Sequence, residues 1–274
     1  MQSMGKRVQS PSSINTYKQC PRRYYYQYIL KLPTCENIHF VKGKIAHSVL
    51  EKFFDIDINH FKEENYKKEL SYYMKNLFNA FWLKNLEKFE DVGASEKDVI
   101  TARHELAEML ANWLQSFFER IDSSGLSFHK AFEKFKPVEI EAAYESEKHQ
   151  VKGFIEVVEN VDGEIKVLDY KTSGSFEITE SYELQLAIYA LLYREKHGKL
   201  PHKLSIWFLK DKEKIIEADE KIIEKAIGEI ANIHIKTESN RIDDYPKQVS
   251  NLCKWRTGKC DFYDHCFSES AKFK

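Results

Sequence analysis

The strongest constraint on this chain is a hairpin signal between residues 151 and 171. Two apolar runs, Val151–Val158 and Ile165–Tyr170, are separated by Asp162-Gly163. Asp-Gly between two such runs is typical of a two-residue turn, because both turn positions need positive backbone φ angles. The sequence therefore predicts two antiparallel strands that are joined at this turn.

The hairpin carries two acids and a lysine: Glu156 on the first strand, and Asp169 and Lys171 on the second. Antiparallel pairing can bring Glu156 near Asp169, and Lys171 points to the same side as Asp169 because strand side chains alternate. Two close carboxylates repel each other unless a cation lies between them, and Mg²⁺ and Mn²⁺ prefer carboxylate oxygens. The lysine can orient or deprotonate a water, or stabilise charge on a phosphate. This set suits metal-assisted phosphodiester hydrolysis.

A solvated strand face is the alternative interpretation of the same three residues. Charged residues make up 31% of the chain, and Asp-x-Lys is a short pattern that also occurs without function. The hairpin alone therefore does not decide between a catalytic site and an ordinary charged surface.

Hydrophobic periodicity predicts the elements around the hairpin. Apolar spacing predicts helices beginning near Ser12 and over residues 40–54, 62–89, 95–120, 181–197 and 219–235, with strands over residues 135–144 and 204–210. The order strand, hairpin, helix, strand indicates an α/β fold with a central mixed sheet. In the first strand, Glu139 and Glu141 alternate with apolar residues, which favours solvent-facing positions over an approach to the metal.

Length and charge limit the possible functions. The 274 residues suit one elaborated domain, and the net charge of −1 means that contacts with nucleic acid must come from local clusters. We find no apolar stretch long enough to span a bilayer and no signal peptide, so we expect a cytoplasmic protein with no membrane partner.

The N-terminal segment and His47 each allow two interpretations. Residues 20–28 contain four tyrosines and two arginines, Arg22 and Arg23, a mixture that can stack on bases and hold phosphates or form an aromatic packing helix. His47 lies on an amphipathic helix, where a lone histidine is more often structural than a metal ligand.

The five cysteines are unevenly placed. Cys20 and Cys35 lie near the start, and Cys253, Cys260 and Cys266 lie near the end. In an intracellular chain this favours metal or cluster ligation, or simple packing, over a disulfide framework.

Several segments together resemble the PD-(D/E)XK nuclease superfamily, in its branch of RecB-like and CRISPR-associated exonucleases. These are Glu156, Asp169-Tyr-Lys171 and Gln185-Leu-Ala-Ile-Tyr189, with the segment of residues 10–24, Gly43-Lys-Ile-Ala-His47 and the C-terminal cysteines. The resemblance implies a single nuclease domain (1–274) with a restriction-endonuclease-like core, flanking helices and a helical insertion. Its parts are the N-terminal helices with Cys20 and His47 (10–60), the helical insertion (61–125), the catalytic core (126–240) and the cysteine segment (241–274).

The resemblance also implies roles for individual residues. His47, Glu156, Asp169 and the backbone carbonyl of Tyr170 are expected to bind Mg²⁺ or Mn²⁺, and Lys171 to assist the attacking water. The family usually has aspartate where this chain has Glu156, and the extra methylene shifts a ligand atom by about 1 Å, a change that can cost on the order of a hundredfold in rate. Side chains expected to contact DNA are Gln185, Tyr189, Arg22 and Arg23.

A [4Fe–4S] cluster held by Cys20, Cys253, Cys260 and Cys266 is the further implication. The spacing between Cys253 and Cys260 is longer than is usual in the family, although a longer loop costs little entropy to close. Zinc, bound by the four thiolates or with His265 replacing one of them, is the alternative, and Cys35 is the expected spare cysteine.

The resemblance thus predicts a metal-dependent DNA nuclease, a RecB-like exonuclease that acts on single-stranded ends in DNA repair, recombination or CRISPR adaptation. A helicase, a CRISPR-adaptation protein or a second copy of the chain is the expected partner. The alternatives are a non-catalytic DNA-binding or scaffold subunit with the same fold, and a nuclease directed at RNA.

Overall fold

A five-stranded sheet lies at the centre of the computed structural model, which describes residues 7–174, 176–255 and 258–268. The strand order is β1-β2-β3-β4-β5, with β3 and β4 parallel and the other neighbours antiparallel. This is the predicted mixed sheet. The strands are β1 (Glu139–Ser146), β2 (Val151–Val161), β3 (Glu164–Lys171), β4 (Lys203–Phe208) and β5 (Glu213–Glu217), with a separate short pair, β6 (Lys254–Trp255) and β7 (Gly258–Lys259).

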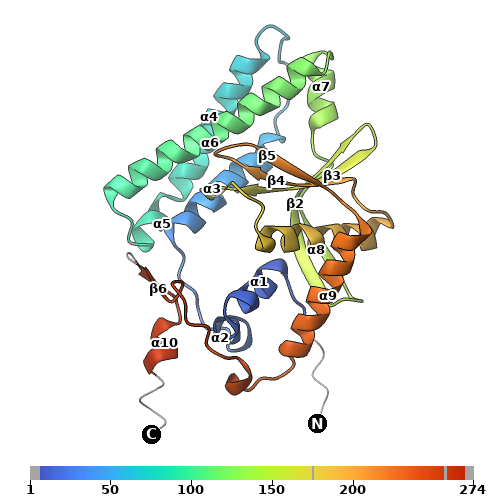
Figure 1. Ribbon diagram of the computed structural model, residues 1–274. Helices are drawn as coiled ribbons and strands as arrows, with labels where there is room; N and C mark the ends of the chain where they lie inside the picture. Colours follow the sequence, from blue (N-terminus) through green and yellow to red (C-terminus); the bar gives the residue numbers. More distant parts are fainter. Residues whose placement is uncertain (1–6, 175, 256–257, 269–274) are drawn as a thin grey trace.

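Helices cover both faces of the sheet (Figure 1). Those packed on one face are α3 (Ile38–Phe53), α4 (Tyr66–Lys84), α5 (Leu86–Asp91), α6 (Glu96–Ser123) and α7 (Phe128–Phe135). Those on the other face are α1 (Pro11–Gln19), α8 (Glu180–His197) and α9 (Glu220–Lys236). Short helical segments near the two ends are α2 (Pro21–Tyr24), the π-helical turn η1 (Tyr25–Ile29), the 3₁₀ turn η2 (Ile242–Asp244) and α10 (Tyr263–Ser268).

The β2–β3 hairpin has the predicted turn. Val161 pairs with Glu164 across Asp162-Gly163, and both turn residues have positive φ angles, 55° and 90°. Because only glycine, asparagine and aspartate adopt this conformation readily, the dipeptide fixes the register of the two strands. The register in turn brings Glu156 and Asp169 to the same end of the hairpin.

The helical insertion departs from the sequence prediction in two places. Residues 62–89 form α4 and α5 in place of one helix, and the break falls at Asn85, whose side-chain amide donates to the Phe81 carbonyl at 2.8 Å. The predicted strand over residues 135–144 begins only at Glu139, because Phe128, Phe132 and Phe135 form the buried side of α7. Phenylalanines spaced by four and three residues lie on one side of a helix. This helical pattern is stronger than the short alternation that predicted a strand from residue 135.

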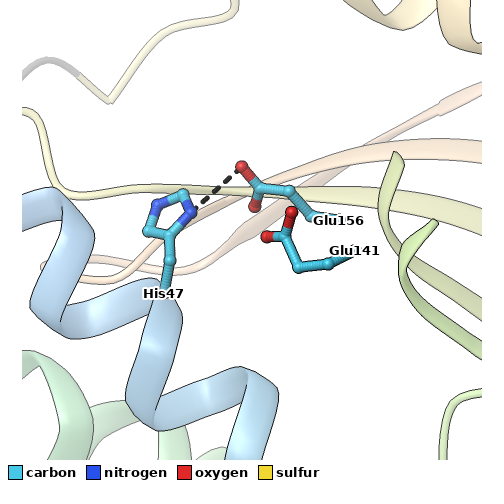
Figure 2. Close-up of side chains that lie close together, drawn as sticks. All are labelled: His47, Glu141 and Glu156. Atoms are coloured by element: carbon cyan, nitrogen blue, oxygen red, sulfur yellow. Dashed lines mark ion pairs between the residues drawn. The ribbon is translucent and has the colours of Figure 1, made fainter. Parts of the chain in front are cut away.

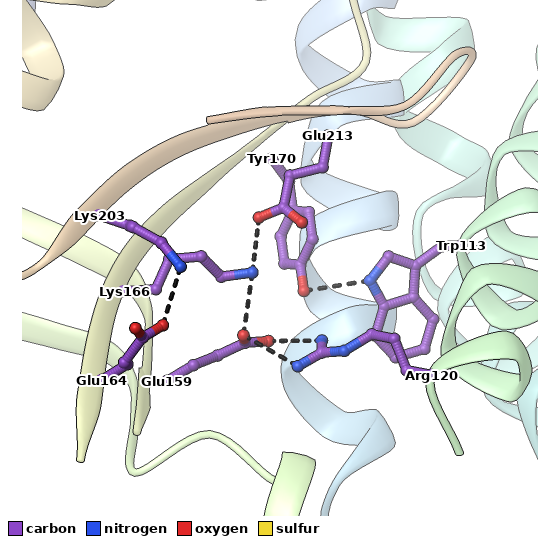
Figure 3. A network of polar contacts seen from close by, with 8 residues as sticks. All are labelled: Trp113, Arg120, Glu159, Glu164, Lys166, Tyr170, Lys203 and Glu213. Carbon is purple, nitrogen blue, oxygen red and sulfur yellow. Dashed lines mark hydrogen bonds and ion pairs between the residues drawn. The ribbon is translucent and has the colours of Figure 1, made fainter. Parts of the chain in front are cut away.

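A buried ionic group joins the insertion to the sheet (Figure 3). Arg120 of α6 donates to both carboxylate oxygens of Glu159 on β2, at 2.8 and 3.1 Å, and Lys166 bridges Glu159 and Glu213 at 3.0 and 2.6 Å. Burial opposes the Glu159 charge, but Lys166 and Arg120 outweigh it and hold the pKa of Glu159 below its ordinary value. Beside this group, the Trp113 indole donates to the Tyr170 hydroxyl at 3.2 Å, which fixes the end of β3.

The two ends of the described chain pack against each other. Tyr24 and Tyr26 are fully buried with Tyr245 and Phe262, and the Arg22 guanidinium donates to the Tyr245 carbonyl at 2.7 Å. These tyrosines therefore serve as packing residues, the second of the two interpretations of this segment, and are not available to stack on bases.

Candidate active site

The strands β2 and β3 separate where the predicted catalytic residues lie. Their last ladder pair in this direction joins Val157 to Leu168. Beyond it, the backbone amide of Tyr170 donates to Oε2 of Glu156 at 2.7 Å. A side-chain carboxylate thus takes the place of a backbone acceptor, which holds Glu156 rigidly at the edge of the opening.

Glu141 reaches the same opening from β1. The β1–β2 ladder pairs Ile140 with Val157 and Ala142 with Ile155, and Glu141 and Glu156 occupy the position between these pairs. Glu141 has a φ angle of 48°, a left-handed conformation that costs a residue with a Cβ about 1 kcal/mol or more. Glu141 is exposed to solvent, as the alternation predicted, but it also lies beside His47 and Glu156, so the expectation that it does not approach the metal-binding residues was wrong.

His47 of α3 completes a close group of metal-binding side chains (Figure 2). Its Nδ1 lies 3.1 Å from Oε1 of Glu156, and one ligand atom from each of His47, Glu141 and Glu156 lies within 4.8 Å of the other two. Burial of the imidazole opposes its charge, but Glu156 and Asp169 outweigh burial and raise the pKa of His47. Burial also opposes the Glu156 charge, and His47, Lys171 and the Tyr170 amide together hold the pKa of Glu156 below its ordinary value.

Asp169 lies beside this group and is completely buried. Its Oδ1 accepts a hydrogen bond from Gln185 at 2.8 Å, and its Oδ2 is paired with the Lys171 ammonium. Burial, with a further contribution from Glu156, raises the pKa of Asp169 to about 7. In the part of the chain that the structure describes, Glu141 and not Asp169 completes the close group of three, and metal binding by Asp169 or by the Tyr170 carbonyl stays a prediction.

Lys171 is largely buried and keeps its charge. Burial opposes the ammonium form, but Asp169 and Glu156 outweigh it and raise the pKa of Lys171. Its Nζ also lies 5.2 Å from the centroid of the Tyr182 ring. A charged ammonium at this position can stabilise negative charge better than it can accept a proton.

The α8 residues Gln185 and Tyr189 support the site from the opposite face. The Gln185 amide lies 2.8 Å from Asp169 Oδ1 and 2.8 Å from the Tyr189 hydroxyl, and the Tyr189 side chain is 5% exposed. The ring also packs where Gly153 leaves room on β2, since a Cβ there would lie 3.1 Å from it. The structure therefore places this pair as a brace for Asp169, and their contact with DNA stays a prediction.

The four predicted cluster cysteines converge at the other end of the molecule. Cys20, between α1 and α2, lines one small cavity together with Cys253, Cys260 and Cys266, while Cys35 is exposed. Burial, followed by the neighbouring Cys20, raises the pKa of Cys266 to about 11. Arg23 lines the same cavity and lies 3.9 Å from Asp261, so Arg22 and Arg23 belong to the packed ends.

The donor set at the sheet fits a hard divalent cation. Two carboxylates and one imidazole offer oxygen and nitrogen ligands, and two further charges, the Asp169 carboxylate and the Lys171 ammonium, adjoin them. Mn²⁺ and Mg²⁺ accept this combination. A bound cation would also relieve the repulsion between Glu156 and Asp169, which adds to the effect of burial in raising the pKa of Asp169.

Comparison with known proteins agrees with this fold. The family model of the PD-(D/E)XK nuclease superfamily matches residues 9–267, so the chain belongs to this superfamily, whose members are nucleases that generally use divalent metals. A solved structure from Eubacterium rectale named "Putative exonuclease" is similar in fold, with a TM-score of 0.50 and 12% identity over 95% of this chain and 88% of that chain. No curated protein sequence matches the chain. Among the described residues, none of the helices has the length and apolar character needed to cross a membrane.

Proposed function

We propose that the protein is a metal-dependent DNA nuclease, a RecB-like exonuclease that hydrolyses single-stranded ends in the cytoplasm. The observation that carries the proposal is the convergence of His47, Glu141 and Glu156 next to the Asp169–Lys171 pair. A scaffold protein needs neither three converging candidate metal ligands nor a buried ammonium beside them, and burying the charges of Asp169 and Lys171 costs stability that a scaffold has no reason to give up.

Each residue has a chemical role in this proposal. Mg²⁺ or Mn²⁺ bound by His47, Glu141 and Glu156, with Asp169 and the Tyr170 carbonyl as further ligands, supplies Lewis-acid activation of water and phosphate. Lys171 stabilises the negative charge that develops on the phosphate as water adds to phosphorus and the bond to the leaving oxygen breaks. Gln185 fixes the orientation of Asp169 through their hydrogen bond.

The direct test is cleavage of end-labelled DNA. Single-stranded DNA, double-stranded DNA and RNA of matched sequence are incubated with Mn²⁺, Mg²⁺ or EDTA. We expect metal-dependent shortening of single-stranded DNA, and loss of activity by roughly 100-fold or more in Lys171→Ala and Asp169→Ala. Glu139→Gln serves as the control, because Glu139 binds Tyr144 and Lys196 away from the opening. Equal metal-independent degradation by all variants would refute the proposal, and a preference for RNA would favour an RNA-directed nuclease.

For the cysteine cavity we propose a [4Fe–4S] cluster that joins the two ends. A Cys₄ zinc site, with Zn–S bonds of about 2.3 Å, brings its sulfurs to about 3.8 Å from one another. The convergence of Cys20, Cys253, Cys260 and Cys266 on one cavity supports a thiolate-bound metal group there. A broad visible absorption band that disappears in Cys266→Ser would support the cluster, whereas a colourless protein with bound zinc would refute it.

The proposed nuclease function also suggests a pathway and partners. We infer that the nuclease acts in DNA repair, recombination or CRISPR adaptation, together with a helicase, a CRISPR-adaptation protein or a second copy of the chain. Co-purification with tagged protein from the native cell would identify which of these it binds.

A further inference from the structure

One exposed face of α3 leads directly to the metal site. Phe40, Lys44 and His47 are spaced by four and three residues, so they follow one another along the same side of the helix. Phe40 and Lys44 together are called the α3 track here. The track begins roughly 10 Å from His47 along the helix axis.

Phe40 is unusual for a phenylalanine because its side chain is 52% exposed. The apolar residues of α3 that form the core lie on the other side of the helix, among them Val41, Ile45 and Val49. An exposed aromatic ring next to positive charge is the usual stacking platform for an unpaired base.

Two further lysines lie near Lys44 of the track, each on a different helix. Lys44 of α3 and Lys88 of α5 are in side-chain contact, and Lys84, the last residue of α4, lies close enough to act on Lys88. The contact with Lys44, followed by burial, lowers the pKa of Lys88, and Glu36 is the acid that opposes this effect. Lys44, Lys84 and Lys88 together are called the lysine group.

Glu36 acts on the lysine group only from beyond ion-pair distance. Across the described ranges, no carboxylate lies in ion-pair contact with any of the three ammoniums, although the chain as a whole carries a net charge of −1. Like charges in contact cost free energy unless an anion lies between them. Backbone phosphates spaced along a strand are anions that fit three ammoniums on adjacent helices.

We propose that the α3 track and the lysine group form the path by which single-stranded nucleic acid reaches the metal site. The lysines hold successive phosphates, and the Phe40 ring stacks on one unpaired base. This inference rests on the proposed nuclease function and adds to it the surface that selects a single strand, because a paired base cannot stack on an exposed ring without leaving its duplex.

Two variants separate the two contacts. Equilibrium binding is measured by fluorescence anisotropy in Ca²⁺, with an oligothymidine and an oligonucleotide of the same length that has abasic sites along its sequence. Phe40→Ala is expected to weaken oligothymidine binding by roughly 5- to 100-fold, and to leave binding of the abasic strand unchanged. Lys44→Gln/Lys88→Gln is expected to weaken binding of both strands. Its slope of log K against log salt should be shallower by about 0.7 for each lysine removed.

Matched controls are available on the same chain. Tyr72→Ala removes an aromatic ring that is 69% exposed on α4, and Lys221→Gln/Lys236→Gln removes two exposed lysines from α9 on the other face of the sheet. Both controls should bind like the unaltered protein. Equal weakening by controls and test variants, or loss of abasic binding in Phe40→Ala, would overturn the proposal.

A separate assay distinguishes failure of the proposed strand path from failure of the proposed nuclease function. Hydrolysis of bis(p-nitrophenyl) phosphate by the unaltered protein with Mn²⁺ tests the metal site without any strand. Hydrolysis of this ester, combined with unchanged DNA binding in the Phe40 and lysine variants, would refute the path and leave the nuclease assignment intact. Tighter binding of duplex than of single strands would also refute it.

Discussion

The Glu156 carboxylate accepts a hydrogen bond from the backbone amide of Tyr170 through Oε2, at 2.7 Å. Its other oxygen, Oε1, lies 3.1 Å from Nδ1 of His47. One side chain therefore ties the end of β3 to α3 across the gap between β2 and β3. Because both oxygens are engaged, the length of this side chain fixes where they lie in the candidate metal site.

Shortening this residue tests that relationship. In Glu156→Asp the carboxylate retracts by one methylene and cannot keep both contacts, so we expect DNA cleavage to fall by roughly 100-fold, even though aspartate is the residue that the family resemblance leads one to expect. Initial rates at saturating Mn²⁺ measure the effect, and Glu139→Asp is the matched control. An activity equal to or above that of the unaltered protein would show that Glu156 does not set the metal position.

We expect the Glu141 side chain to strengthen metal binding while its backbone conformation lowers the stability of the fold. Replacing it by glycine removes the cost of its positive φ angle, so Glu141→Gly is expected to stabilise the metal-free fold by about 1 kcal/mol and to weaken Mn²⁺ binding by roughly 10-fold or more. Urea unfolding and isothermal titration calorimetry measure the two effects. Gln150, with a φ angle of 51°, provides the comparison: Gln150→Gly should gain stability without a change in metal affinity. Unaltered affinity in Glu141→Gly would exclude Glu141 as a ligand.

Titration of Asp169 should make the stabilisation of the fold by Mn²⁺ depend on pH. Its pKa of about 7 in the folded protein is above its ordinary value of 3.8, so the metal-free fold loses stability as pH rises from about 4 to about 7. A divalent cation offsets the buried charge. The gain in melting temperature on adding Mn²⁺ is therefore expected to be small near pH 5.5 and larger near pH 8. Thermal unfolding at a series of pH values measures it, and Asp169→Asn should flatten the dependence. A gain that is constant with pH in the unaltered protein would contradict this reasoning.

The buried ionic group of Arg120, Glu159 and Lys166 predicts a large stability effect away from the site. Arg120→Ala removes one of the two cations that pair with Glu159, a residue that is only 6% exposed. We expect a loss of about 3 kcal/mol in the free energy of unfolding. Lys67→Ala, which breaks the exposed pair with Asp122, should cost at most about 1 kcal/mol.

The same buried ionic group should make the fold less stable at acid pH. The folded pKa of Glu159 lies below its ordinary value of 4.5, so its contribution is complete above that value and is lost as pH falls through the folded pKa. Chemical unfolding at decreasing pH should show a steeper loss in the unaltered protein than in Glu159→Gln. Parallel curves would mean that Glu159 does not contribute in this way.

The sequence predicted those parts of the molecule that depend on local rules. Asp162-Gly163 specified the hairpin because the turn needs positive φ angles, and helical spacing placed Gln185 and Tyr189 on one side of α8. The position of Glu141 was not predictable in the same way. Alternation correctly indicates an exposed side chain there, but its left-handed backbone and its closeness to His47 and Glu156 depend on contacts between distant segments that no local pattern encodes. The strand β5 was missed because its five residues, Glu213–Glu217, carry too short a pattern.

The seam between the two ends of the chain has a consequence for how the protein is made. The central sheet is complete once residue 217 has been added, but Tyr24 and Cys20 obtain Tyr245 and Cys266 as neighbours only when the last segment leaves the ribosome. Because domains assemble during synthesis as their parts become available, the sheet can form while the thiol cavity is still open. Loading of that cavity with the proposed cluster would then be a late event, which follows translation and does not guide it.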